Sequence, residues 1–191
     1  MIETNYDILG RIRSETAALH VTLESSPVLK CLLSPQVNKQ DYLRYIELSA
    51  IYHQLVETCS FPAVKYIIDD LDARRKNIHI NRDLQILGKS KFSLQSYSAS
   101  ERSAAFHLGM VYVAEGSTLG GKVLLKHLRP TLKSIVPAFN LLDCYGDETA
   151  SKWRKFTTQL GQYASTCSQK EQDEIVEGAL NGFRINLSIF N

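Results

Sequence analysis

The feature that most constrains this sequence is a segment with three glycines, Tyr112–Leu128, which otherwise has the pattern of a continuous apolar helix. Glycine inside a helix costs roughly 1 kcal/mol relative to alanine, so Gly116, Gly120 and Gly121 require an explanation. Three explanations compete. The segment could be a phosphate-binding loop, it could pack closely against another helix, or a flat cofactor could lie against its exposed backbone.

The phosphate-binding loop is the weakest of the three explanations. Gly116 to Lys122 satisfies the spacing G-x-x-x-x-G-K, but Val123 stands where a Ser or Thr hydroxyl would hold the magnesium ion. Residues 104–115 also show helical spacing, so the strand that normally precedes such a loop is not required. A nucleotide-binding function that uses residues 116–122 is therefore a less favoured alternative.

Length and composition predict one domain over residues 1–191, because 191 residues that are 44% hydrophobic can bury a sizeable core. The formal charge of +2 comes without a basic stripe, so we expect no nucleic-acid partner. The four cysteines form no C-x-x-C pair, which suits a reducing compartment. No leader-like start and no run of about twenty apolar residues is present, so we expect a cytoplasmic protein that does not enter a membrane.

Apolar residues recur at helical spacing along most of the chain, and no alternating strand pattern appears. Helices are expected at about 7–24, 28–33, 38–58, 63–71, 82–87, 98–130, 147–163 and 168–190. Ser98–Glu101 and Ser168–Glu171 are capping boxes that would begin two of these helices, and Asp147 would cap another. Asp72–Asn77 is expected to be a charged, solvated loop. The predicted fold class is all-α, with about eight helices.

The histidines raise the question of a metal centre. A di-iron site in a helical protein needs Glu-x-x-His pairs, and none of the 11 glutamates has a histidine three residues later. His20 is followed four residues later by Glu24, which places both on one helix face, where the carboxylate would orient the imidazole as a metal ligand. His53 and Glu57 share this spacing. The spacing alone is therefore not specific, and an ordinary polar contact is the default interpretation for either pair.

Two segments together resemble a known family. Thr16–Glu24 is similar to the proximal helix of heme oxygenases, and Glu115–Gly121 is similar to their distal helix, especially in the bacterial biliverdin-producing branch. Further similarity extends over nearly the whole chain, at Tyr145-Gly146, Trp153-x-x-Phe156 and Phe183–Phe190. The resemblance implies a single-domain, all-α helical bundle with heme between a proximal helix and a kinked, glycine-rich distal helix.

The resemblance also implies roles for individual residues. His20 would be the axial ligand of the heme iron, Glu24 its hydrogen-bonding partner, and Arg13 a cationic partner for a heme propionate. Gly116 and Gly120 would leave room for oxygen on the other face of the heme.

Three more residues complete the expected site. Phe183 would form part of the pocket wall, and Tyr112 would contact the heme. Ser117 occupies a position where animal members of the family carry an aspartate and bacterial members carry serine. The expected catalytic set is therefore His20, Ser117 and Gly120, with His20 as the only metal ligand.

The implied reaction is oxidative cleavage of heme, which acts as both substrate and cofactor, to biliverdin, iron and carbon monoxide. Molecular oxygen and electrons from a partner reductase or ferredoxin would be required. A heme carrier or sensor without turnover would keep His20 and the glycines, and it remains the alternative from another functional class.

Overall fold

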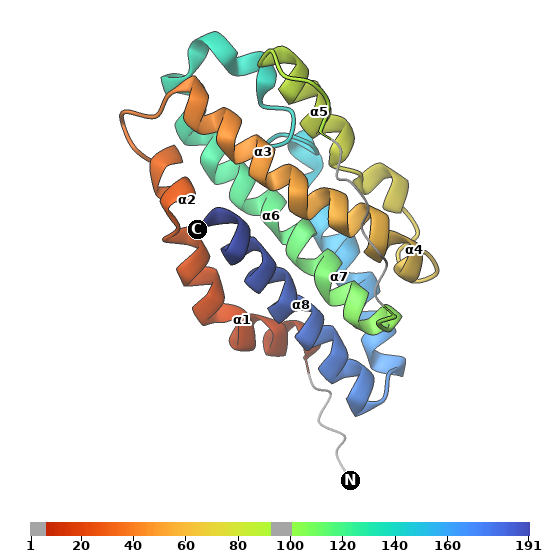
Figure 1. Ribbon diagram of the computed structural model, residues 1–191. Coiled ribbons are helices and arrows are strands. Elements are labelled where there is room, and N and C mark those ends of the chain that lie inside the picture. Colours follow the sequence, from red (N-terminus) through yellow and green to blue (C-terminus); the bar gives the residue numbers. More distant parts are fainter. Residues whose placement is uncertain (1–6, 93–100) are drawn as a thin grey trace.

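The structure is a computed structural model that describes residues 7–92 and 101–191, and those residues contain helices and no strand, as predicted (Figure 1). The α-helices are α1 (Ile8–Glu24), α2 (Pro27–Leu32), α3 (Lys39–Leu55), α4 (Phe61–Val64), α5 (Asn77–Ile86), α6 (Ala104–Thr131), α7 (Thr149–Thr166) and α8 (Gln169–Phe190). A π-helical turn, η1 (Val56–Ser60), continues α3, and three 3-10 turns are η2 (Leu71–Arg74), η3 (Lys133–Ala138) and η4 (Gly146–Glu148).

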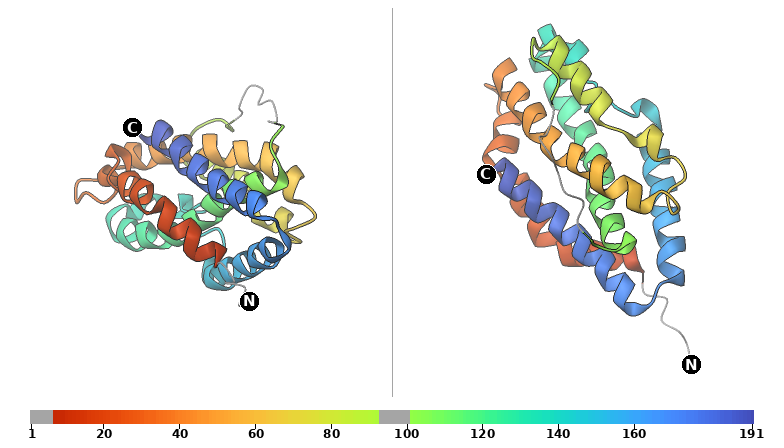
Figure 2. Two further views of the ribbon diagram at one scale, coloured as in Figure 1. Left: turned by 90° about the horizontal axis from the view of Figure 1, so that it is seen from below. Right: turned by 45° about the vertical axis from the view of Figure 1, so that its right-hand side comes forward.

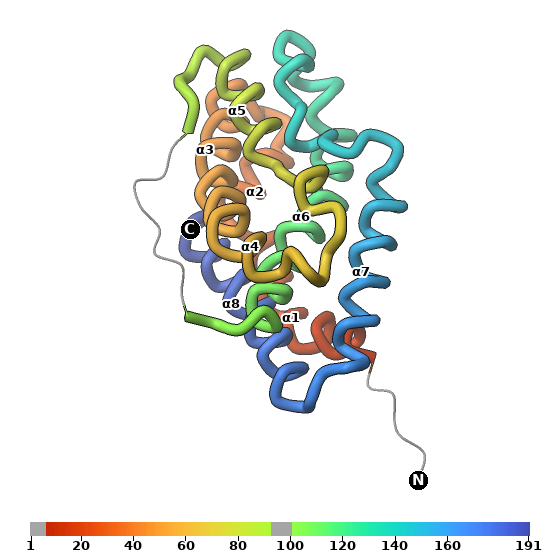
Figure 3. The backbone as a smooth tube through the Cα atoms, turned by 90° about the vertical axis from the view of Figure 1, so that its right-hand side faces the viewer, coloured from red at the N-terminus to blue at the C-terminus, as the bar shows by residue number. Residues whose placement is uncertain are grey.

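The longest helix, α6, is the centre of the arrangement. Helix α8 lies alongside α6, and α1 packs on α8, as the two views of Figure 2 also show. Figure 3 shows α7 along one side of the molecule and α3 with α5 along the other, with α6 between them. The first half of α6 is therefore surrounded by protein, which explains its almost uninterrupted apolar sequence.

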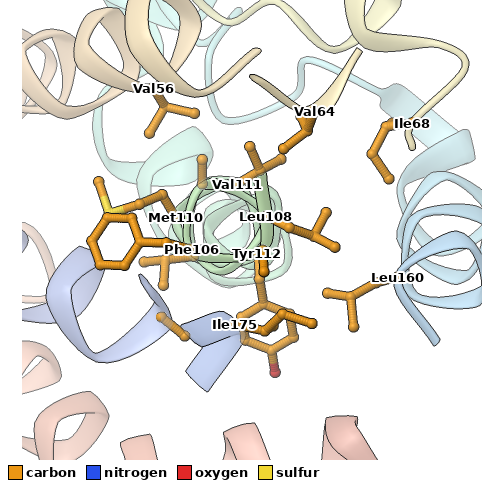
Figure 4. Packing of buried hydrophobic residues seen from close by; sticks show 14 of the residues in the cluster. Val56, Val64, Ile68, Phe106, Leu108, Met110, Val111, Tyr112, Leu160 and Ile175 are labelled. Carbon is orange, nitrogen blue, oxygen red and sulfur yellow. The ribbon is translucent and has the colours of Figure 1, made fainter. Parts of the chain in front are cut away.

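Figure 4 shows this surrounding core along the axis of α6. Val64 and Ile68 cover one side of the helix, Leu160 of α7 covers a second, and Ile175 of α8 covers a third. A second buried cluster gathers α3, α5, η3 and the C-terminal half of α6. The two clusters thus share α6 as a common wall.

Helices α6 and α8 cross with their backbones in direct contact at two glycines. A Cβ atom at Gly109 would overlap the carbonyl oxygen of Ile175, and one at Gly178 would overlap the carbonyl oxygen of Phe106. Only glycine permits this separation, because both opposing atoms belong to helix backbones that cannot move independently. The closest packing between these helices therefore lies two turns before Gly116, the first of the three glycines at 116, 120 and 121.

Several predicted helix boundaries are confirmed by their caps. Asp7 caps α1 with its side chain on the Leu9 N–H, and capping boxes at Asn38 and Ser168 begin α3 and α8. The expected cap at Asp147 is wrong by one residue, because residues 146–148 form a 3-10 turn and Glu148 precedes α7.

The predicted start of the long glycine-bearing helix is wrong. Residues 98–100 lie outside the described part of the chain, but α6 begins only at Ala104, where the Ser103 side chain accepts the N–H of Phe106. From there the helix runs unbroken through all three glycines to Thr131, one residue beyond Pro130.

Two predictions between α3 and α5 are also wrong. The helix expected at 63–71 is only the short α4, followed by turns and η2. The charged segment Asp72–Asn77 is not simply a solvated loop, because Arg74 is fully buried and Lys76 is 2% exposed. Both side chains bind Glu115 of α6, and this distant carboxylate compensates for the desolvation of the two cations.

Candidate functional site

A cavity of about 1050 Å³ lies between α1 and α6, and residues of α2, α3, α7 and α8 complete its walls. Its lining includes Tyr112 and Phe183 from one buried cluster and Leu124 and Phe190 from the other, so it lies where the two clusters meet. All eight residues expected at the site line this one cavity: Arg13, His20, Glu24, Tyr112, Gly116, Ser117, Gly120 and Phe183. A large, mostly apolar cavity with a few convergent polar groups is typical of a small-molecule site.

The wall from α1 carries the expected polar side chains on one face. Arg13, His20 and Glu24 recur at intervals of seven and four residues, close to two turns and one turn of helix. The His20 side chain is 56% exposed, and its Nδ1 lies 3.5 Å from the Glu24 carboxylate. The imidazole ring also contacts the Phe183 ring in an edge-on arrangement, with 5.6 Å between the two ring centroids. His20 is thus oriented by two neighbours without being enclosed by them.

The wall from α6 is open at two glycines, where the helix presents backbone and no side chain. A Cβ atom at Gly120 would have no neighbour within 4 Å, and one at Gly116 would make an ordinary contact with the Trp153 ring at 3.7 Å. Gly121 differs, since its Cβ would lie only 3.2 Å from the carbonyl oxygen of Leu142. Close packing therefore accounts for Gly121, whereas neither packing nor a turn accounts for Gly116 and Gly120.

The phosphate-binding loop is excluded by the same segment. A loop of this kind needs a strand, a turn and then a helix, but residues 104–131 form one helix. Lys122 pairs with Asp143 at 2.5 Å. The lysine that would bind a phosphate is therefore already occupied.

Arg13 and Tyr112 meet at the cavity from different helices. Burial raises the pKa of Tyr112, while the neighbouring Arg13 guanidinium acts to lower it. Arg13 is exposed to solvent and Tyr112 is buried, so this pair lies across the boundary between the cavity and the surface.

Ser117 is exposed on α6, one residue after Gly116. Its hydroxyl donates to the Ala114 carbonyl at 2.7 Å, a common arrangement for serine within a helix. The hydroxyl oxygen therefore presents only its lone pairs to the cavity.

Comparison with known proteins agrees with this arrangement. The family model described as heme oxygenase matches residues 6–191. The chain belongs to the heme oxygenase family. A curated heme oxygenase from Xanthomonas campestris pv. campestris (strain 8004) is 34% identical over 89 residues, which are 47% of this chain and 52% of that protein. The match thus spans about half the length of that relative.

Solved heme oxygenase structures share the fold. The NO- and CO-bound heme oxygenase from Neisseria meningitidis aligns with 96% of this chain and 89% of its own, with a TM-score of 0.72 and 21% identity. Heme oxygenase-1 from the cyanobacterium Synechocystis sp. PCC6803, solved in complex with heme, aligns with 97% of this chain and 91% of its own, with a TM-score of 0.73 and 16% identity. At such identities these likenesses establish the fold of this heme oxygenase family member.

The cavity lining also contains polar and aromatic residues that were not expected at the site, among them His53, Trp153 and Asn186. His53 is 6% exposed, and burial together with the charge of Lys76 lowers its pKa to about 3. Glu57 does not pair with it, because the Glu57 carboxylate accepts the backbone N–H groups of Lys76 and Asn77. The sequence signal that could have placed His53 in the interior is that α3 carries apolar residues on more than one side, which indicates a central helix.

The residues that line the cavity are chemically suited to bind heme. The cavity offers an accessible imidazole on α1 and two glycines without side chains, Gly116 and Gly120, on α6. Its apolar walls suit a porphyrin, and Arg13 at the solvent boundary suits a carboxylate. No helix in the described residues is long and apolar enough to cross a membrane.

Proposed function

We propose that this protein cleaves heme oxidatively to biliverdin, iron and carbon monoxide, using molecular oxygen and electrons from a partner reductase or ferredoxin. The observation that carries the proposal is that one cavity brings His20 of α1 together with the side-chain-free Gly116 and Gly120 of α6. Membership of the heme oxygenase family supports it, as does the likeness to a heme oxygenase that was solved in complex with heme.

His20 is the proposed axial ligand and Glu24 its positioning partner. When bound, heme supplies both the iron that activates oxygen and the ring carbon that is oxidised. A carboxylate on Nδ1 favours the tautomer that leaves the other ring nitrogen free to bind a metal. The edge of Phe183 limits rotation of the imidazole from a second direction.

The glycines of α6 and the apolar lining are proposed to shape the reacting space. Open space beside Gly120 would admit a small ligand, and the buried Tyr112 and Phe183 would exclude bulk water. Ser117 can accept a hydrogen bond from a water molecule in this space, because its own proton is committed to Ala114. The chain thereby supplies binding and orientation, while the cofactor carries the chemistry.

The protein is proposed to act in the cytoplasm as a single domain. The cysteines of the structure, Cys31, Cys59, Cys144 and Cys167, are all free, which supports the cytoplasm as its location. We also infer that residues 1–191 act as one heme oxygenase-like domain, since the family model spans residues 6–191.

The proposed function is tested by titrating the purified protein with hemin and then adding reductant in air. The expected result is saturable hemin binding followed by replacement of the heme absorption band by that of biliverdin. A carrier or sensor would instead bind hemin and keep it intact through the same treatment, and that outcome would contradict the proposal.

Replacing Gly120 with leucine is expected to lower biliverdin formation about 10–100-fold, because the side chain enters space on which the reaction depends and small misplacements are costly. Gly120→Ala should show the same defect more weakly, with less than about 1 kcal/mol change in folding stability. Hemin affinity and helix content should be nearly unchanged in both variants. Biliverdin yield, hemin titration and circular dichroism measure the three quantities.

Gly161 of α7 provides the matched control for Gly120. It is also a helical glycine whose added Cβ would have no neighbour within 4 Å, and it does not line the cavity. Gly161→Leu should therefore change helix propensity and nothing else. A normal biliverdin yield from Gly120→Leu would exclude Gly120 from the reacting space.

Replacing Arg13 with glutamate is expected to weaken hemin binding about 3–10-fold at low ionic strength and less at high ionic strength, since an exposed charge pair is worth little and is screened by salt. Hemin titrations at several salt concentrations measure this dependence. Lys126→Glu makes the same charge change at an exposed position of α6 that does not line the cavity. If the two variants show equal salt dependence, Arg13 does not contact a propionate.

A further inference from the structure

A buried cluster of charged and polar side chains holds α6 beside its glycine wall. Glu115 immediately precedes Gly116 and is 2% exposed, but its side chain is not part of the cavity lining. Its carboxylate accepts from Arg74 at 2.5 Å, from Lys76 at 2.7 Å and from the Tyr145 hydroxyl at 3.0 Å to either oxygen. We call Arg74, Lys76, Glu115 and Tyr145 the Glu115 cluster.

The donors of this cluster are themselves held in place by several segments. Arg74 also donates to Asp70 at 2.6 Å and to the backbone carbonyl of Lys152 in α7 at 3.2 Å. The Lys76 ammonium donates to the Tyr145 hydroxyl at 2.6 Å and to the Arg74 carbonyl at 2.7 Å. A shift of α6 relative to these segments would therefore strain several charged hydrogen bonds at once.

Stability alone is a poor explanation for such a cluster. Buried ion pairs are expensive to desolvate, and well-packed apolar residues of similar size are often as stable or more so. A network of charged hydrogen bonds with fixed geometry provides a defined position instead. The most direct effect of the Glu115 cluster is therefore to fix the position of α6.

The shape of the cavity depends on a fixed position of α6 for a reason that is specific to this helix. At Gly116 and Gly120 the helix presents no side chain of its own, so the space beside these two residues depends strongly on where the helix backbone lies. Successive residues of a helix are about 100° apart around its axis, so a small rotation would turn Ser117 or Leu119 toward or away from the cavity. Glu115 is adjacent to this wall and resists that rotation.

We propose that Glu115, with Arg74, Lys76 and Tyr145, is a positioning cluster that sets the rotation and depth of α6 over the cavity and so determines which ligands and which edge of the substrate this wall admits. This inference rests on the proposed function only for the identity of the substrate. The members of the cluster are positioning residues, since they act through the helix backbone.

The first test compares two ligands of different size on the hemin-bound protein. Glu115→Gln is expected to change the ratio of imidazole affinity to cyanide affinity by at least about 5-fold, in line with the couplings that residues outside a site exert on it. Tyr145→Phe, which removes one hydroxyl and keeps both ion pairs, should shift the ratio in the same direction by less. Ligand titrations of ferric protein followed by absorption measure the ratio without any turnover.

Ser60→Ala is the matched control. It also removes a buried polar contact to α6, because the Ser60 hydroxyl lies 3.0 Å from the His107 ring. His107 precedes Glu115 by about two turns of α6, and neither Ser60 nor His107 lines the cavity. The affinity ratio of Ser60→Ala should equal that of the wild type at a comparable loss of stability. If the Glu115 variants lose stability but keep the wild-type ratio, the cluster only stabilises the fold and the proposal is wrong.

A second measurement separates this inference from the proposed function. Hydrogen exchange of the amides at 113–121 in heme-free protein should be faster in both cluster variants than in Ser60→Ala, and unchanged exchange would overturn the proposal. Where biliverdin forms, the cluster variants should also give a broader mixture of biliverdin isomers. Hemin binding without turnover would contradict the proposed activity alone, because neither the ligand ratio nor the exchange depends on product formation. Should Glu115→Gln fail to fold, Tyr145→Phe alone decides the outcome.

Discussion

Replacing His20 with alanine is expected to lower biliverdin formation by more than about 100-fold, since even the partners of metal ligands are typically worth about 10–100-fold. The fold should persist, because the side chain is 56% exposed and contributes little packing. Circular dichroism, the absorption spectrum of the hemin complex and biliverdin yield measure the three consequences. Added imidazole should restore part of the activity, because it can occupy the vacated position beside Phe183.

His127→Ala is a suitable control for this experiment. His127 is another partly exposed histidine on a helix, but it does not line the cavity. Its removal should leave the hemin spectrum and the biliverdin yield unchanged. A His20→Ala protein with a wild-type spectrum and full turnover would show that another group binds the iron.

Replacing Gly178 with alanine is expected to lower the free energy of unfolding by more than about 3 kcal/mol, a large part of the stability of an ordinary domain. The added Cβ would overlap the Phe106 carbonyl and lie 3.2 Å from the Cα atom of Gly109, and both belong to the backbone of α6. Neither helix can retreat without disturbing the core that they share. Denaturant unfolding followed by circular dichroism measures the loss.

The control for Gly178 is Gly161→Ala, which has the same helix propensity change in open space. That variant should gain up to about 1 kcal/mol. If Gly178→Ala unfolds within about 1 kcal/mol of the wild type, the two helices are able to separate and the close crossing is not needed for the fold.

The sequence by itself determined the helical fold class, most helix positions and a set of residues that line one cavity. Helical spacing of apolar residues and local caps such as Asp7 and Ser168 depend on neighbours within a few residues, so they can be recognised without a structure. The spacing of His20 and Glu24 is local in the same sense. The resemblance of two distant motifs to heme oxygenases then linked α1 to α6, and all eight residues expected at the site do line one cavity.

Only the tertiary structure decided which contacts each glycine and each charged residue makes. Gly120 faces open space, Gly116 leaves room for an ordinary contact with Trp153, and Gly121 packs against Leu142, although all three look alike in the sequence. Glycine spacing within one helix does not show which turn another backbone approaches, so the contact of Gly109 with α8 could not be foreseen.

The charged segment Asp72–Asn77 shows the same limit most clearly. Its composition predicts a solvated loop, yet Arg74 and Lys76 are buried because Glu115 lies opposite them, 41 and 39 residues later in the chain. Whether a charge can be buried depends on a partner that compensates for its desolvation, and that partner is brought into place only by the fold.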